Sequence, residues 1–126
     1  MKLHRVLLFT SLQMDITPVG HDLHVLLTND TIPFIGSTVY ARITSMPEAD
    51  DDQAEPECEL LTLDNVEEPD ALFCRYTAEK LAKKTGQNVL CTGGIFTDNP
   101  SERDIAKLYE NIDEMMQDWS VFFTDD

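Results

Sequence analysis

Residues 78–90, AEKLAKKTGQNVL, join the end of a predicted helix to the start of a predicted strand. Small and apolar side chains recur at helical spacing before and within this stretch, at Ala71, Cys74, Ala78, Leu81, Ala82 and Thr85. Such a face of small residues allows a helix to lie close against a sheet. Gly86 can adopt the left-handed backbone conformation that closes a helix. We therefore expect a helix over residues 69–85, begun by Pro69, and then a strand over residues 89–96.

Most of the other predicted strands come before this helix. Residues 38–44 alternate apolar and polar side chains, which is the period-two pattern of a half-buried strand. A bulge or a close backbone approach is expected at Gly93 and Gly94, inside the last strand. Further short strands are expected at residues 3–14, 23–28, 32–35 and 60–63, with turn-forming residues over 15–20.

A second helix is predicted near the C-terminus. Asn99, Pro100 and Glu102 resemble an N-cap, a first-turn proline and a capping box. An apolar stripe follows at intervals of three and four residues, at Ile105, Leu108, Ile112, Met115, Trp119 and Phe122. Early strands with short connections, followed by helix, strand and helix, predict an α+β fold. We expect an antiparallel, sandwich-like β-sheet of about six strands with two main α-helices.

The composition limits the number of domains and the classes of partner. The chain has 126 residues, which is typical of one domain, and its hydrophobic fraction of 42% is that of a globular protein. We expect a single domain over residues 1–126. Asp and Glu number 24 against 9 Lys and Arg, giving a net charge of -15, so the average field repels nucleic acid and anionic lipid. Residues 46–57 predict an acidic loop that is either solvated or docked on a basic partner.

The cysteines and the apolar runs indicate a compartment. Cys58, Cys74 and Cys91 cannot all pair within one chain, and no secretory signal pattern precedes them. The apolar run at residues 6–9 is far shorter than the roughly 18 residues that span a bilayer. We therefore expect reduced thiols and a cytoplasmic protein, with the nucleus as a second location.

No arrangement of catalytic, cofactor-binding or metal-binding residues rises above chance. A strand would place the rings of His21 and His24 on opposite faces, which is poor geometry for a shared metal. The cysteines form no Cys-x-x-Cys pair, and Thr92-Gly93-Gly94 is too short to cradle a phosphate. We predict a protein that is not an enzyme and holds no cofactor or metal. The competing hypothesis is a small cytosolic enzyme that uses Cys58, His21 or His24, or an acid–base pair.

The run Ala-x-x-Leu-Ala-x-Lys-Thr-x-x-x-Val, from Ala78 to Val89, resembles the eukaryotic proteasome assembly chaperone 4 family. Leu108-Tyr-Glu-Asn111 and, more weakly, Ile35-Gly36 share the resemblance. It implies a non-enzymatic chaperone that pairs with a related chaperone of the third type. The heterodimer would hold proteasome α-subunits, notably the fifth, while the α-ring of the core particle forms. The alternative among binding proteins is an adaptor subunit of another complex.

Five residues are predicted to contact a partner. Lys80, Lys83 and Lys84 form the one basic cluster of an acidic chain and could pair with acids on a partner, although a solvated helix end would show the same pattern. Tyr109 and Met116 widen the apolar stripe of the last helix. We expect either that one small sheet leaves part of this stripe uncovered for a partner, or that the stripe is simply core.

Overall fold

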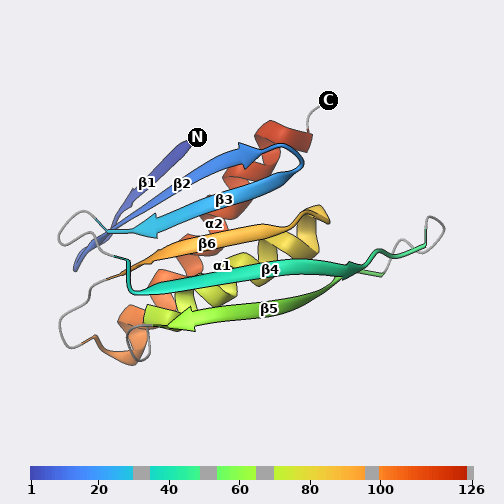
Figure 1. Cartoon of the computed structure of the whole chain (residues 1–126). Helices are drawn as coiled ribbons and strands as arrows, with labels where there is room; N and C mark the ends of the chain where they lie inside the picture. Colours follow the sequence, from blue (N-terminus) through green and yellow to red (C-terminus); the bar gives the residue numbers. More distant parts are fainter. Residues whose placement is uncertain (30–34, 49–53, 65–69, 96–99, 125–126) are drawn as a thin grey trace.

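Six strands form one sheet, and both helices cover the same face of it (Figure 1). The computed structural model describes residues 1–29, 35–48, 54–64, 70–95 and 100–124. In chain order the elements are β1 Lys2–Val6, β2 Ser11–Val19, β3 Asp22–Thr28, β4 Ser37–Ser45, β5 Glu57–Asp64, α1 Asp70–Thr85, β6 Val89–Gly94 and α2 Glu102–Thr124. The predicted α+β fold, with about six mostly antiparallel strands and two helices, is confirmed.

The strand that follows α1 is inserted into the middle of the sheet, whose order is β1-β2-β3-β6-β4-β5. β6 pairs in parallel with β3, where Val25 lies opposite Cys91, and antiparallel with β4, where Tyr40 lies opposite Leu90. The other described pairs are antiparallel. Helix α1 packs against β4, β5 and β6, whereas α2 contacts β1 and α1. The two helices therefore share the covered face and leave the other face open.

The first predicted strand, residues 3–14, is in fact two strands. The N–H of Leu7 donates to the carbonyl of Thr10 at 2.8 Å, and this turn separates β1 from β2. The turn expected over residues 15–20 lies mostly within β2, and the chain reverses at Gly20, where φ is 61°. No glycine or proline marks the first reversal, so the pattern resembles one continuous strand.

The remaining predicted strands agree with the structure except at their ends. Residues 23–28 and 38–44 correspond to β3 and β4, and residues 60–63 lie within the longer β5. β6 is shorter than predicted because its ladder ends at Gly94. Residues 32–34 of the predicted strand over residues 32–35 lie outside the described residues, and Ile35 is not part of a strand. The middle of the acidic loop also lies outside the described residues.

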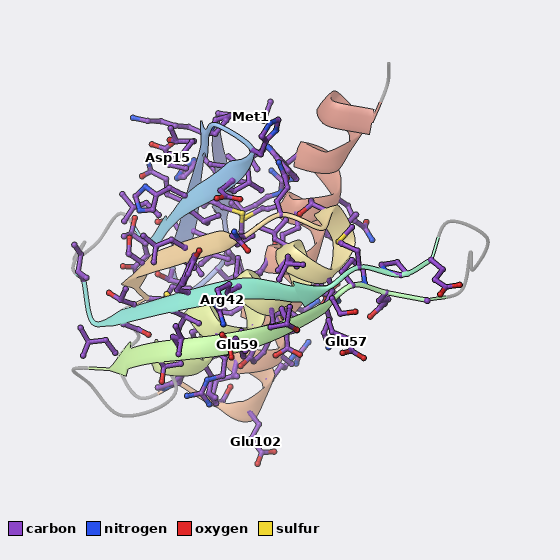
Figure 2. All side chains as sticks on the ribbon, turned by 45° about the vertical axis from the view of Figure 1, so that its right-hand side comes forward. Met1, Asp15, Arg42, Glu57, Glu59 and Glu102 are labelled. Atoms are coloured by element: carbon purple, nitrogen blue, oxygen red, sulfur yellow. The ribbon has the colours of Figure 1, made fainter. Side chains whose placement is uncertain are left out.

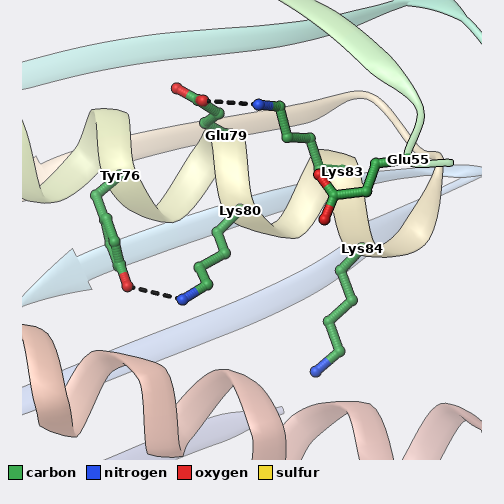
Figure 3. Close-up of a pocket in the computed structure, with 6 residues that line it drawn as sticks. All are labelled: Glu55, Tyr76, Glu79, Lys80, Lys83 and Lys84. Carbon is green, nitrogen blue, oxygen red and sulfur yellow. Dashed lines mark hydrogen bonds and ion pairs between the residues drawn. The ribbon is translucent and has the colours of Figure 1, made fainter. Parts of the chain in front are cut away.

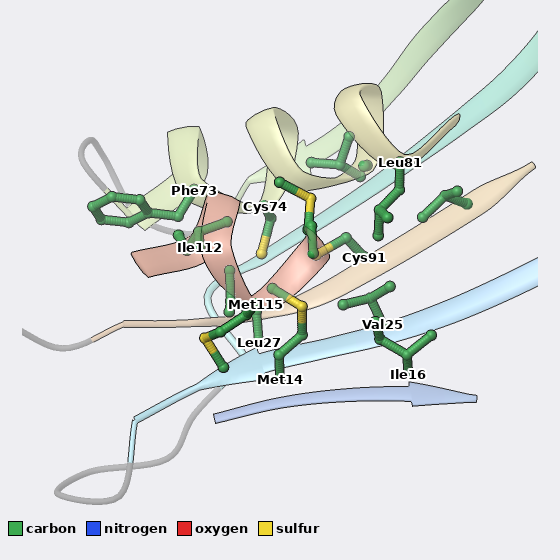
Figure 4. Close-up of a cluster of buried hydrophobic side chains, with 14 of the residues drawn as sticks. Met14, Ile16, Val25, Leu27, Phe73, Cys74, Leu81, Cys91, Ile112 and Met115 are labelled. Carbon is green, nitrogen blue, oxygen red and sulfur yellow. The ribbon is translucent and has the colours of Figure 1, made fainter. Parts of the chain in front are cut away.

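The covered face of the sheet holds the hydrophobic core (Figure 4). Its side chains come from both helices and from the inner strands, and each fully buried one stabilises the fold by about 1.5–3 kcal/mol relative to exposure. Neither helix in the described part of the chain is long and apolar enough to cross a membrane. The largest fully buried side chains are Phe73, Leu12, Met14, Ile16, Leu27, Leu81, Ile95, Leu108, Ile112, Met115, Val25 and Val39.

The end of α1 agrees with its prediction. Cys74, Ala78, Leu81 and Ala82 are all buried, so the face of small residues does pack on the sheet. Gly86 has a φ of 72°, and its N–H donates to the carbonyl of Ala82 at 2.8 Å. This left-handed residue turns the chain from α1 into β6.

Helix α2 begins with a capping box formed by Ser101 and Asp104. The N–H of Asp104 donates to Ser101 Oγ, and the N–H of Ser101 donates to Asp104 Oδ2, both at 3.1 Å. This reciprocal pair satisfies donors that the first turn of a helix leaves unpaired. The predicted N-cap, Asn99, lies outside the described residues, and Glu102 is the first helical residue.

Candidate functional site

The three lysines of the predicted basic cluster line one cavity of about 610 Å³ along α1. We name it the lysine cavity. Lys80 and Lys84 extend towards α2, whereas Lys83 lies with Glu79 on the side of α1 away from α2 (Figure 3). Tyr76 and Glu79 of its lining come from α1, and Glu55 comes from the segment before β5. Its lining residues are Glu55, Tyr76, Glu79, Lys80, Lys83 and Lys84.

Carboxylates already pair with two of these lysines. Lys80 Nζ donates to the Tyr76 hydroxyl at 2.9 Å and lies 3.0 Å from Asp113 Oδ1. The hydrogen bond with Tyr76, and to a lesser extent that with Asp113, raises the pKa of Lys80 above its usual 10.5. Lys83 Nζ lies 3.1 Å from Glu79 Oε1, and this hydrogen bond raises the pKa of Lys83. Because both lysines face carboxylates, the lysine cavity is closer to neutral than its lysines alone suggest.

The two predicted partner contacts on α2 differ in exposure. Tyr109 is half-buried, with the rings of Phe73 and Tyr76 each 4.9 Å from its own ring. Met116 is 3% exposed and belongs to the core, so of the two alternatives for the apolar stripe, the core alternative applies at this residue. Helix α2 lies close enough to the sheet to bury it. That any of the five residues contacts a partner stays a prediction.

A second cavity, of about 690 Å³, lies between the β1–β2 turn and the first half of α2. One wall is the apolar run Val-Leu-Leu-Phe at residues 6–9, and the other wall carries the polar side chains of α2. We name it the hairpin groove. Its lining residues are Val6, Leu7, Leu8, Phe9, Arg103, Asp104, Lys107 and Asn111.

The apolar wall of the hairpin groove is unusually exposed. Val6 is 78% exposed and Leu8 is 107% exposed, although both are large aliphatic side chains. Consecutive apolar residues on a surface typically mark a binding site. Residues 6–9 were predicted to be part of a strand over residues 3–14 and to be too few to span a membrane. The missed signal was an apolar run that lacks the alternation of a half-buried strand.

The open face of the sheet carries a mixed surface. His24 Nε2 lies 3.3 Å from Thr92 Oγ1 across β3 and β6. Arg42 on β4 and Glu59 on β5 form an ion pair on the same face (Figure 2). Two leucines of β5 are more than half exposed there. This face offers a broad contact surface with both polar and apolar groups.

Two residues of the competing enzyme hypothesis, Cys58 and His24, lie far apart. Cys58 packs against the core from β5, whereas His24 lies on the open face of β3, and β6 and β4 lie between these strands. At about 4.8 Å per strand, the two backbones are roughly 14 Å apart. Burial, and then Glu79, raise the pKa of Cys58, which disfavours the reactive thiolate. Within the described ranges, no group of three or more His, Cys, Asp or Glu could hold a metal ion.

Residues 9–122 match the family described as prenylated flavin chaperone LpdD-like domain. The chain belongs to this family. A comparison with curated proteins finds no match. The part of the chain that matches the LpdD-like family begins at Phe9, in the hairpin groove, and continues through all later strands and most of α2.

Membership in the LpdD-like family overturns the assignment to proteasome assembly chaperone 4. The predicted role in α-ring assembly is wrong, and so are the predicted partners, a third-type chaperone and proteasome α-subunits. The residues from Ala78 to Val89 that carried the resemblance have structural roles: small side chains pack on the sheet, and Gly86 closes α1. Any protein in which such a helix is followed by a strand requires small side chains for packing and a residue that closes the helix. The broader prediction of a chaperone agrees with the family.

Proposed function

We propose that this chain is a non-enzymatic chaperone for a prenylated flavin, which it binds reversibly and passes to an enzyme that uses the flavin. The family match over residues 9–122 is the observation that carries the proposal. The separation of Cys58 from His24 also favours binding over catalysis, because a nucleophile needs its base within hydrogen-bonding reach.

The cavities have a size and a chemistry that suit such a ligand. Small-molecule sites commonly enclose about 300–1,000 Å³ and combine apolar walls with a few polar groups. The hairpin groove and the lysine cavity measure about 690 and 610 Å³. A flavin is a flat aromatic ring system, a prenyl group adds hydrocarbon to it, and a flavin mononucleotide also carries a phosphate. Both cavities place apolar or aromatic surface beside cationic side chains.

A carrier has to release its ligand as well as bind it. A dissociation constant near 1 μM corresponds to about -8.2 kcal/mol, which is enough for loading and weaker than the nanomolar affinity of a tight cofactor site. Exposed lining residues suit this balance, since the ligand can leave without unfolding the core. We also propose that the transfer occurs in the cytoplasm, because all three cysteines are free thiols and such thiols are typical of a reducing compartment.

Transfer of the cofactor tests this proposal. Prenylated flavin mononucleotide is incubated anaerobically with or without the chain and then added to the cofactor-free form of an enzyme that depends on it. We expect the chain to increase the rate or the yield of active enzyme in a concentration-dependent manner. An unrelated acidic protein of similar size controls for unspecific protection. An unchanged rate and yield, together with no flavin retained by the chain on gel filtration, would contradict the proposal.

A further inference from the structure

We infer that the hairpin groove is the flavin-binding site, with the phosphate held by Arg103 and Lys107 and the apolar ring system covered by residues 6–9. This inference rests on the proposed function and adds the location and the division of the site. The occupant is a prenylated flavin that bears a phosphate.

The apolar half of the site follows from exposure. Val6, Leu8 and Phe9 are 78%, 107% and 40% exposed, and they are neighbours along one short turn. A row of exposed apolar side chains disfavours solubility unless a ligand or a partner covers it. A prenylated flavin would bring aromatic and hydrocarbon surface of matching character to this wall.

The half of the site that would bind the phosphate follows from the positive charges of α2. Arg103 and Lys107 are four residues apart on α2, so their side chains lie on the same side of the helix and both line the groove. Arg103 stands in the first turn of α2, where the helix dipole disfavours a cation. Its position is therefore not explained by helix stability. Lys107 pairs at 3.3 Å with Glu110, and both groups are exposed, so this ion pair holds Lys107 only weakly.

The lysine cavity fits a prenylated flavin less well. Lys80 and Lys83 already face Asp113 and Glu79, and a third carboxylate also lines that cavity. A phosphate would have to bind beside these carboxylates or displace them. The one carboxylate of the hairpin groove, Asp104, accepts the cap hydrogen bond of α2. Lys107 of the hairpin groove faces Glu110 in the same way, and the lining of each cavity carries one more cation than carboxylates. The exposed apolar wall of residues 6–9, which has no counterpart in the lining of the lysine cavity, therefore favours the hairpin groove.

Titration with two ligands separates the two halves of the site. The ligands are prenylated flavin mononucleotide and the same compound after removal of its phosphate, both kept anaerobic. We expect Arg103→Ala with Lys107→Ala to weaken binding of the phosphorylated ligand by about tenfold or more and to leave binding of the other ligand unchanged. Leu8→Ser should weaken binding of both ligands.

The control variant changes Lys80, Lys83 and Lys84 to alanine and should bind both ligands as the wild type does. Circular dichroism and urea denaturation confirm that each variant is folded. If Leu8→Ser fails to fold, Val6→Ser takes its place, because its side chain is exposed in the same wall.

Each other outcome overturns the inference in a recognisable way. If the wild type binds flavin and the groove variants bind equally well, the site is wrong while the proposed function stands. If the lysine variant alone loses the contribution of the phosphate, the flavin occupies the lysine cavity. If Leu8→Ser leaves flavin binding unchanged but halves the mass measured by sedimentation, from that of a dimer to that of a monomer, a second copy of the chain covers the groove. If the wild type binds neither ligand, both the inference and the proposed function fail.

Discussion

Gly93 on β6 lies directly against the backbone of Leu27 on β3. A Cβ atom at Gly93 would be 2.9 Å from the carbonyl carbon of Leu27, and the φ of Gly93 is 130°. Both the contact and the dihedral angle require glycine. The sequence predicted a bulge or a close backbone approach at this position, and the close approach is confirmed. Since β6 joins the two halves of the sheet, this glycine permits the pairing on which the fold depends.

We expect Gly93→Ala to lower the free energy of unfolding by about 3 kcal/mol or more, because the clash is with backbone atoms that cannot turn aside. Gly20→Ala is the matched control. Its φ is 61°, but nothing lies within 4 Å of the added Cβ, so only backbone strain of about 1 kcal/mol is expected. Urea denaturation measures both losses. Equal losses would show that the contact with Leu27 does not limit the fold.

Gly86→Val should lower the melting midpoint because valine disfavours the left-handed conformation that closes α1. The expected loss is about 1 to 2 kcal/mol, and the new Cβ would also crowd Met46 Cε at 2.8 Å. Gly86→Asn should cost less, since asparagine tolerates this conformation. A Gly86→Val protein that melts at the wild-type temperature would refute this account of the helix end.

Cys91 should make stability fall at alkaline pH. A hydrogen bond with Cys74, and then burial, raise the pKa of Cys91 well above 9.0. The contribution of the neutral Cys91 thiol to the free energy of unfolding is fully present below pH 9.0. It is lost as the pH rises from 9.0 towards the folded-state pKa, because the thiol ionises first in the unfolded chain. The loss is up to about 1.4 kcal/mol per pH unit. Urea denaturation of the wild type and of Cys91→Ala between pH 8 and about 10.5 should show a shallower decline for the variant, and parallel declines would contradict this.

If the lysine cluster contacts a partner protein, as predicted, it should affect the rate at which the flavin is transferred to the recipient enzyme. Lys84 is exposed, so Lys84→Glu should leave folding and flavin affinity intact. If acids on the recipient enzyme face this cluster, the variant should slow transfer at low ionic strength, and the effect should fade at high salt. Stopped-flow transfer at two salt concentrations measures it. Lys2→Glu, on the edge strand β1, is the matched control, and equal rates for both variants would exclude the cluster.

Local patterns predicted the elements but not their pairing. The alternation over residues 38–44 and the helical spacing up to Thr85 identified β4 and α1, because each pattern is set by one buried face. The insertion of β6 between β3 and β4 depends on contacts between distant segments, such as that of Leu27 with Gly93. No local pattern contains that information.

The hairpin groove could not be predicted for the same reason. It joins residues 6–9 to side chains of α2 that are almost a hundred residues away in the sequence. The basic cluster was found because its lysines are close together in the sequence, but their partner Asp113 comes from α2. The family was misassigned because the stretch that ends α1 reports on helix closure and packing, which differ little between proteins with different ligands.

Isothermal titration of the wild-type chain with prenylated flavin mononucleotide, under anaerobic conditions, tests the central claim most directly. Unmodified flavin mononucleotide is the matched ligand. The account predicts saturable binding of the prenylated flavin with a dissociation constant near or below about 1 μM, and binding of the unmodified flavin that is at least about tenfold weaker. The absence of saturable binding of the prenylated flavin, or equal affinity for the two flavins, would contradict it.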